Sequence, residues 1–189
     1  MGAVEPRSPA DYFEAGMELL AGGGVAAVTV ARLCDALGVT KGSFYHHFRG
    51  VEDFKAQLLA HWASEREQQA VAAAAAVDDP FQRLDLLREA AIGLHHEAEV
   101  AIRAWSRHDA AAWKVRETVD AARERVVAEA YRQVGVQGAT ADLLGRMAVA
   151  VLVGVQHRSE VIDRCELRAL YRRLQEMAEA SFIPSTARQ

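Results

Sequence analysis

The sequence predicts an all-α fold of about nine helices, in which an N-terminal three-helix helix-turn-helix head precedes a larger helical bundle. Apolar residues recur three and four positions apart along most of the chain, which is the period of a helix face. Capping residues, prolines and glycines divide these stretches, and we find neither strand-like alternation nor an internal repeat. With 189 residues, 51% of them hydrophobic, the chain can build a real core in one or two domains.

The first predicted helix begins after Ser8, which can cap it, with Pro9 at the first helical position and Asp11 in the first turn. Its inward face is predicted to carry Phe13, Met17 and Leu20. The glycines at 22–24 are expected to end it. This helix would supply the third side of the head's core.

A second and a third helix are predicted on either side of a tight turn. Thr29 can cap the second helix, and Gly38 can end it in a left-handed conformation. Its buried face would comprise Val30, Leu33, Cys34 and Leu37. Thr40 can then cap a short helix in which Phe44 and Phe48 point inward. That leaves a small, polar and cationic outer face, which suits a helix that enters the major groove of DNA.

The rest of the chain is predicted to be helical with short connections. Asp79-Pro80 and Asp163 mark two further helix starts. The expected helices cover about 51–77, 80–96, 97–108, 110–134, 140–161 and 164–182. We expect a DNA-binding domain over residues 1–50, a second domain over 51–183 and a polar tail over 184–189.

The run from Thr29 to Phe48 contains Gly-Val-x-Lys-Gly-x-x-Tyr-x-His-Phe and resembles the N-terminal DNA-binding segment of the TetR family of transcriptional repressors. The resemblance covers about the first 55 residues. Beyond them it is limited to length, helical character and the segment Arg103-Ala104-Trp105. It implies a DNA-binding regulator that recognises a palindromic operator as a homodimer and is released by a small apolar molecule. A helical hairpin without a DNA role is the alternative.

On this interpretation, Lys41 and Ser43 contact base edges, and Gly42 lets the backbone approach the DNA closely. Phosphate contacts, which position the protein without reading sequence, are assigned to Thr29, Thr40, Tyr45 and His46.

The middle helices carry large rings and nearby polar groups that would line an effector cavity if they converged. The predicted ligand-binding residues are Trp62, Phe81, His95, Arg103, Trp105, Trp113 and Tyr131. The alternative for each ring is ordinary core packing.

The helix at 140–161 is apolar nearly all round between Met147 and Val155, so it must be covered on more than one side. The resemblance implies that the last two helices of two subunits form a four-helix bundle. The predicted dimer interface comprises Leu144, Met147, Val151, Leu152, Val155, Leu170, Leu174 and Met177. Deep burial within a monomer is the alternative.

The charge is unusual for a DNA-binding protein. The chain carries a net charge of −4, and residues 1–50 contain four Lys/Arg against five Asp/Glu, a net of −1. The arm before the first helix offers only Arg7, and Val51 stands where the family commonly has a phosphate-contacting lysine. These features leave open a second interpretation, a small-molecule binding protein with a weakened DNA-binding head.

No catalytic constellation emerges, so we expect neither an enzyme nor a cofactor. His96-Glu97 begins like a zinc-protease helix, but Val100 replaces the second histidine, and we predict no metal site. Cys34 and Cys165 are expected to be free thiols. With no apolar signal region and no run of about 18 apolar residues without charges, we expect a cytoplasmic protein that does not associate with membranes.

Overall fold

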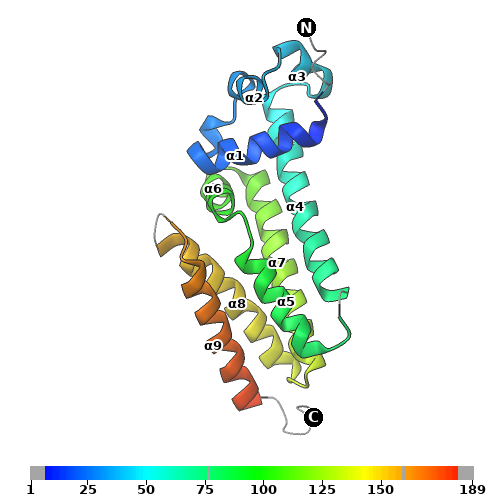
Figure 1. The fold of residues 1–189 in the computed structure, drawn as a ribbon, viewed down its shortest axis with the longest axis vertical. Helices are drawn as coiled ribbons and strands as arrows, with labels where there is room; N and C mark the ends of the chain where they lie inside the picture. The colour runs from blue at the N-terminus through cyan, green and yellow to red at the C-terminus, as the bar shows by residue number, and fades with distance from the viewer. Residues whose placement is uncertain (1–6, 76, 159–160, 183–189) are drawn as a thin grey trace. The chain divides into compact units, whose positions relative to one another are not determined.

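The computed structural model describes residues 7–75, 77–158 and 161–182. Within these ranges it contains nine α-helices and no strand (Figure 1), which confirms the predicted fold class. The helices are α1 (Pro9–Ala27), α2 (Val30–Leu37), α3 (Lys41–His47), α4 (Val51–Ala75), α5 (Pro80–Ile92), α6 (His96–Ser106), α7 (Ala110–Gln133), α8 (Gly138–Arg158) and α9 (Arg164–Phe182).

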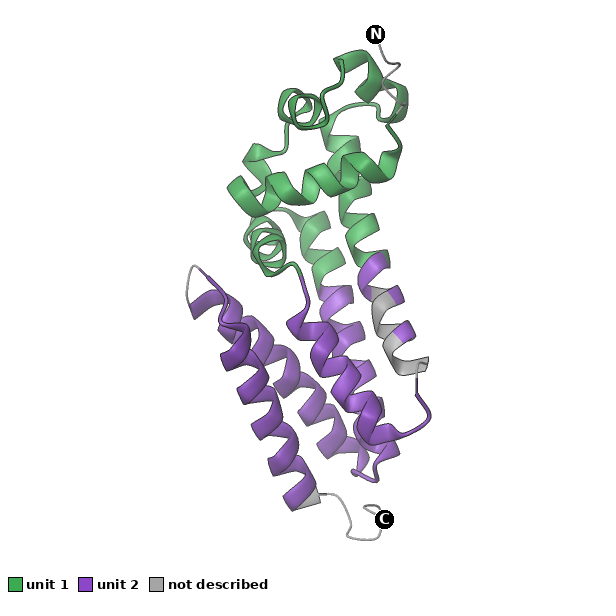
Figure 2. Ribbon diagram, in the orientation of Figure 1, with its two compact units in different colours: residues 1–64, 95–116 green, residues 65–94, 117–189 purple. Residues whose placement is uncertain are grey.

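The chain forms two compact units, which Figure 2 distinguishes by colour. Unit 1 comprises residues 1–64 and 95–116, and unit 2 comprises residues 65–94 and 117–189. The division therefore does not fall at residue 50, because the first part of α4, all of α6 and the start of α7 belong to unit 1. The predicted tail at 184–189 lies outside the described residues.

Helix α1 begins with a capping box. The Ser8 backbone N–H donates to Asp11 Oδ2 at 2.6 Å, and the Ser8 hydroxyl accepts from the Asp11 N–H at 3.4 Å. Helical geometry is interrupted at Gly23 and Gly24, and Gly24 has φ 66°, a conformation that glycine adopts without strain. One further turn follows to Ala27, so the predicted glycine break is a kink inside α1 rather than its end.

The core of unit 1 is built from aromatic rings. Tyr12, Phe44, Phe48 and Phe54 are at most 2% exposed. Their ring centroids lie 4.9–5.9 Å apart in mostly tilted or edge-on pairs, the geometry that aromatic pairs prefer. A Cβ at Gly16 would lie 2.8 Å from the Phe54 ring, so the absence of a side chain there allows α1 to approach α4 closely.

Helix α6 packs along α1 and carries polar groups into the interior of unit 1. The indole N–H of Trp62 donates to Glu99 Oε1 at 3.0 Å, and both side chains are at most 2% exposed. A buried carboxylate needs such partners, because desolvation without them is costly.

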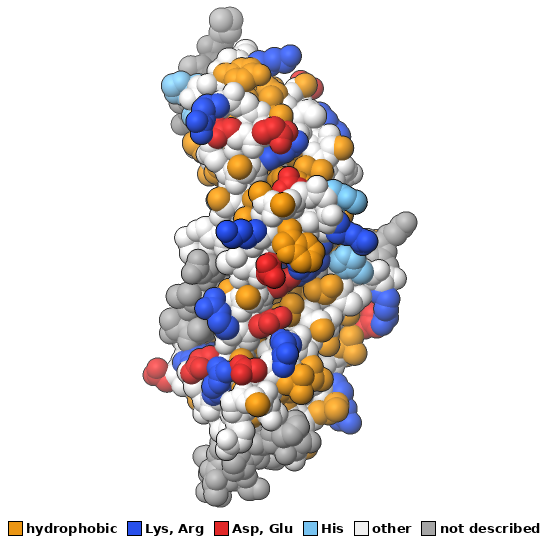
Figure 3. Space-filling view, turned by 180° about the vertical axis from the view of Figure 1, so that it is seen from behind, with side chains coloured by type: hydrophobic (Ala, Val, Ile, Leu, Met, Phe, Trp, Pro, Cys, Tyr) orange, Lys and Arg blue, Asp and Glu red, His pale blue; other side chains and the backbone are white. Residues whose placement is uncertain are grey.

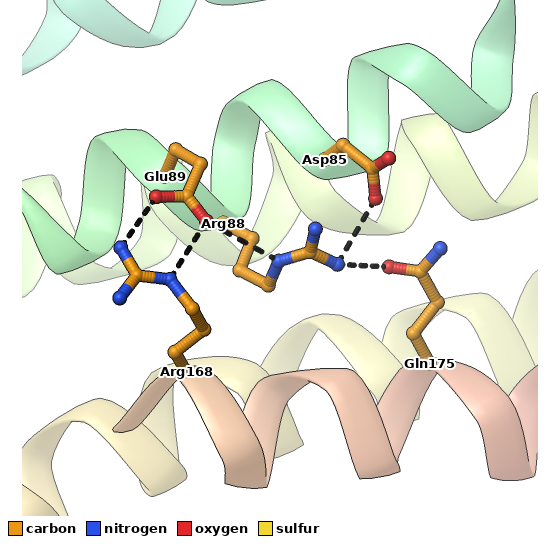
Figure 4. A network of polar contacts seen from close by, with 5 residues as sticks. All are labelled: Asp85, Arg88, Glu89, Arg168 and Gln175. Atoms are coloured by element: carbon orange, nitrogen blue, oxygen red, sulfur yellow. Dashed lines mark hydrogen bonds and ion pairs between the residues drawn. The ribbon is translucent and has the colours of Figure 1, made fainter. Parts of the chain in front are cut away.

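The core of unit 2 is aliphatic, with alanines at many close approaches. A Cβ at Gly145 in α8 would collide with the Glu124 carbonyl oxygen in α7, so only glycine fits at this helix crossing. Helices α5 and α9 are also linked by a polar network (Figure 4). In it Arg168 binds both carboxylate oxygens of Glu89, at 3.2 and 2.8 Å, and Arg88 donates to Gln175 at 2.8 Å.

Helix α8 is long and apolar enough to span a membrane by length and composition alone. Core helices of globular bundles also meet this test, and α8 places Leu144, Leu152 and Val155 in the interior of unit 2, each at most 3% exposed. The rest of its apolar surface remains to be accounted for.

Candidate functional site

We refer to α2, α3 and the turn between them as the reading motif. Local hydrogen bonds cap the start of both helices. Thr29 Oγ1 accepts from the Arg32 N–H at 3.3 Å, and Thr40 Oγ1 accepts from the Ser43 N–H at 3.4 Å. Gly38 ends α2 with φ 65° and ψ 37°, the left-handed conformation expected of a C-terminal glycine. Both threonine hydroxyls keep their proton, so each can still donate to a phosphate oxygen.

Two buried rings fix which side of α3 faces outward. Phe44 is fully buried and Phe48 is 2% exposed, whereas Tyr45 is 57% exposed. The other outward residues are Lys41, Gly42 and His46. Lys41 forms no salt bridge to any residue that the structure describes, so its ammonium group is available to an anion or a base edge.

Ser43 is more constrained than the sequence suggests. It is half-buried, and the Tyr12 hydroxyl donates to Ser43 Oγ at 2.9 Å. The serine oxygen therefore links α3 to α1, while its own proton remains for an outside acceptor.

The inward face of α1 is formed by Tyr12, Gly16 and Leu20, and Phe13 and Met17 are only partly buried. Tyr12, Gly16 and Leu20 lie four positions apart, and this spacing was the sequence signal that could have identified them as the buried face of α1.

His47, not among the predicted residues, holds the start of the described chain against α3. Its Nε2 lies 2.9 Å from the Arg7 carbonyl oxygen. An Nε2–H tautomer donates this bond, which places Arg7 beside the C-terminal end of α3.

Residues 13–60 match the family model described as bacterial regulatory proteins, tetR family. This segment contains most of α1, all of α2 and α3, and the start of α4. This segment is a helix-turn-helix domain of the TetR family. The model that matches it describes bacterial regulatory proteins. No curated protein matches the chain.

Solved structures of low sequence identity share the fold of this chain. A TetR transcription regulator from Haloarcula marismortui has a TM-score of 0.76 at 17% identity, over 93% of this chain and 98% of that one. A protein from Saccharomonospora viridis in complex with choline gives 0.75 at 16%, over 93% and 97%. SmeT, the repressor of the Stenotrophomonas maltophilia multidrug efflux pump SmeDEF, gives 0.66 at 15%, over 96% and 93%.

The predicted effector residues do not gather in one unit of the protein. Unit 1 contains Trp62, His95, Arg103, Trp105 and Trp113, whereas unit 2 contains Phe81 and Tyr131. Trp62 and Trp105 are buried in the core of unit 1, and Trp113 is 49% exposed, with the Arg116 guanidinium 4.3 Å from its ring centroid. Trp62 and Trp105 thus contribute to the packing of unit 1.

Unit 2 contains a cavity of 80 Å³, with walls from α4, α5, α7, α8 and α9 and the Leu94 segment. A second cavity of 60 Å³ has Tyr131 in its wall, the single predicted effector residue that lines either one. The other wall residues, such as Leu87, Val127 and Ala148, are ordinary core types. Sequence reasoning missed them because nothing local distinguishes a cavity wall from a filled core.

The predicted dimer residues fall into two groups. Leu144, Leu152, Val155 and Leu174 are at most 8% exposed and belong to the core of unit 2. Within the single chain they therefore lie on the inner side of α8 and α9. The exposed group contains Met147, Leu170 and Met177, with Val151 half-buried. Leu143, 49% exposed, was missed and belongs with them.

Charged side chains of both signs are mixed over the surface. On the face shown in Figure 3, acidic and basic groups alternate rather than gather into a patch of one sign. In the head, Arg49 is paired with Asp53 at 3.3 Å. A backbone hydrogen bond from Arg49 also lowers the pKa of the Asp53 carboxyl group. DNA binding by the outward face of α3 would therefore depend on a few individually positioned side chains rather than on a strongly basic electrostatic field.

Proposed function

We propose that this protein is a transcriptional regulator of the TetR family, that it binds a palindromic operator as a homodimer and that a small, largely apolar molecule in unit 2 releases it. The observation that carries the proposal is the outward face of α3, where Lys41, Gly42, Tyr45 and His46 are exposed on a helix anchored by Phe44. A helix of this kind can enter the major groove with side chains toward base edges. Such a protein works in the cytoplasm.

Within the groove, Lys41 and Ser43 are the residues proposed to read bases, and Gly42 presents no side chain to hold the backbone away. Thr29, Thr40, Tyr45 and His46 are proposed to contact phosphates. The Tyr12 hydroxyl donates to the Ser43 oxygen and leaves the Ser43 proton free, so Ser43 can donate to an acceptor such as guanine N7 or O6.

The homodimer is proposed to form through α8 and α9. These helices pack against each other and leave Leu143, Met147, Leu170 and Met177 between 39% and 52% exposed. An exposed apolar face of this kind favours a subunit interface. A second copy is the occupant that a palindrome requires, because a two-fold dimer presents two reading helices about 34–36 Å apart, one turn of DNA.

Release by a small molecule is supported by the cavities of unit 2 and by the choline complex of one protein of this fold. Helices α4 and α7 each run from unit 1 into unit 2, so a shift at one end reaches the other through continuous backbone. The coupling is reciprocal, since DNA must weaken ligand binding by the factor by which ligand weakens DNA binding.

Selection of bound duplexes from a random pool tests the operator proposal. We expect a palindromic site, for which Lys41→Ala weakens binding at least about tenfold in a mobility-shift titration. Arg107→Ala, an exposed cation in unit 1 outside the reading motif, should leave affinity unchanged. If no sequence is enriched while small molecules still bind, the second interpretation, a binding protein with a weakened head, replaces this one.

Light scattering after size-exclusion chromatography tests the dimer separately. Leu170→Glu should shift the protein to a monomer, because it places a charge on the proposed apolar interface. Ala104→Glu, at an exposed position of α6, should not. A wild-type protein that is monomeric at micromolar concentration contradicts the proposal.

A further inference from the structure

The two cavities of unit 2 are neighbours. They have Leu87, Ala91, Val127, Ala148 and Tyr171 in common. The side chains at 91 and 148 are small, and the shared residues form a mainly apolar wall that is common to both cavities. A narrow hydrocarbon chain that lies along this wall would contact both.

Cationic groups lie at the edge of this apolar wall. Arg66 and Arg123 line the 80 Å³ cavity, and Arg88 lines the 60 Å³ cavity. Among the described residues that line either cavity, none is a carboxylate. The lining therefore offers guanidinium groups but no carboxylate in a setting of low polarity, so it can pair with a bound anion and has no acidic partner for a cation.

The two arginines of the larger cavity are largely buried, and each lies beside a carboxylate. Their side chains are 13% and 14% exposed. Arg66 lies 3.6 Å from Glu65, and Arg123 lies 3.7 Å from Asp120. The distance at Arg66 exceeds the about 2.7–2.9 Å of a charge-assisted hydrogen bond. Arg66 Nε is also buried without a hydrogen-bond partner in the described structure, which leaves a donor for a bound acceptor.

Tyr171, the other polar side chain of the larger cavity, is already engaged. Its hydroxyl donates to the Ala148 carbonyl oxygen at 3.1 Å, and burial raises its pKa well above the ordinary value. The phenol therefore stays neutral and adds no negative charge to the cavity.

From these features we propose that unit 2 binds a small monocarboxylate, with its carboxylate between Arg66 and Arg123 and its hydrocarbon chain along the shared wall. The 80 Å³ cavity is about half the 150 Å³ that admits benzene, so a short unbranched chain fits better than a ring. The binding site stands on its own geometry, whereas its effect on DNA rests on the proposed function.

Isothermal titration calorimetry of the full-length protein without DNA tests the site. The probes are hexanoate, its neutral counterpart 1-hexanol, and choline as a cation. We expect hexanoate to bind at least about tenfold more tightly than 1-hexanol, because only the carboxylate pairs with the guanidinium groups. Choline should not bind. Equal binding of hexanoate and hexanol, or no binding of hexanoate, overturns the proposal.

Variants locate the binding. Arg66→Gln and Arg123→Gln should each weaken hexanoate binding at least about tenfold and leave hexanol unchanged, whereas Arg107→Gln, in unit 1, should alter neither. Ala91→Leu, which fills the shared wall without changing charge, should abolish binding of both probes and covers the case in which an arginine variant fails to fold. Unchanged hexanoate affinity in well-folded Arg66→Gln and Ala91→Leu contradicts the assignment.

A mobility shift with the selected operator separates the two proposals. If hexanoate binds in the calorimeter and also releases the protein from the operator, both proposals are supported. Hexanoate that binds without releasing DNA supports the site and contradicts release through it. If the protein binds hexanoate but does not bind any selected operator, the result contradicts the proposed function. It then supports the cavity as a binding site alone.

Discussion

Unit 1 and unit 2 fill their interiors with different side chains. Unit 1 packs Tyr12, Phe44, Phe48 and Phe54 ring against ring, whereas unit 2 relies on leucine, valine and alanine and contains two cavities. A few rings with two torsions each fix a short helix in one orientation, which suits a reading head. Small aliphatic side chains leave space and can rearrange at lower cost, which suits a site that must admit a ligand.

The three tryptophans make this comparison measurable. Trp62, Trp105 and Trp113 all lie in unit 1, so tryptophan fluorescence reports the unfolding of that unit, while far-ultraviolet circular dichroism reports the helices of both. A substitution confined to one unit should separate the two transitions.

The largest effect is expected for Phe44→Ala. Removal of a fully buried ring should lower the free energy of unfolding by about 3–5 kcal/mol. The fluorescence transition in urea should move to lower concentration, while hexanoate binding by unit 2 persists. Tyr45→Ala, the exposed neighbour on α3, should change stability little. A fluorescence transition that does not move for Phe44→Ala would show that the ring core does not hold the head together.

A smaller loss is expected for Gly145→Ala in unit 2. The added methyl group meets the Glu124 carbonyl oxygen at the crossing of α7 and α8, so the helices must separate at a cost of about 1–3 kcal/mol. The dichroism transition should shift more than the fluorescence transition. Gly138→Ala, at the start of the same helix with open space around it, serves as the control and should not destabilise.

Tyr12→Phe should have a milder effect, because it removes one partly buried hydrogen bond and keeps the ring. The expected loss is about 0.5–1.5 kcal/mol, measured by urea unfolding followed by fluorescence. The same variant removes the bond that orients the Ser43 hydroxyl, so base preference at the position that Ser43 reads should relax. Tyr45→Phe should leave stability unchanged. An unaltered base preference would argue against Ser43 as a reading residue.

The smallest effect concerns acid pH and the cap of α1. Hydrogen bonds from the Ser8 backbone and side chain hold the pKa of Asp11 below its ordinary value of 3.8. The folded-state pKa is the lower one, so the cap's contribution is complete above the unfolded-state pKa and is lost as pH falls through the folded-state value. Wild type should therefore lose its advantage over Asp11→Asn on passing from pH 7 to pH 3. Glu14→Gln, which alters a carboxylate on the same helix outside the capping box, should show no such convergence.

Features that depend on neighbours in sequence were predictable, and features that depend on distant contacts were not. The caps at Thr29 and Thr40 and the turn at Gly38 follow from residues three or four apart, so the reading motif could be placed in advance. The Tyr12–Ser43 bond joins residues 31 positions apart, and no local pattern announces it. The cavities are set by how five helices leave space, so the sequence indicated aromatic rings where the walls are aliphatic.

The scarcity of cations in the reading head has a consequence for how the protein finds its target in a chromosome. Attraction to arbitrary duplex grows with the number of phosphates a protein neutralises, and here Lys41 stands almost alone on α3. Few molecules would then be sequestered on the millions of decoy positions that compete with a true site. A modest intracellular copy number would suffice for occupancy, and the dwell time on each decoy would be brief.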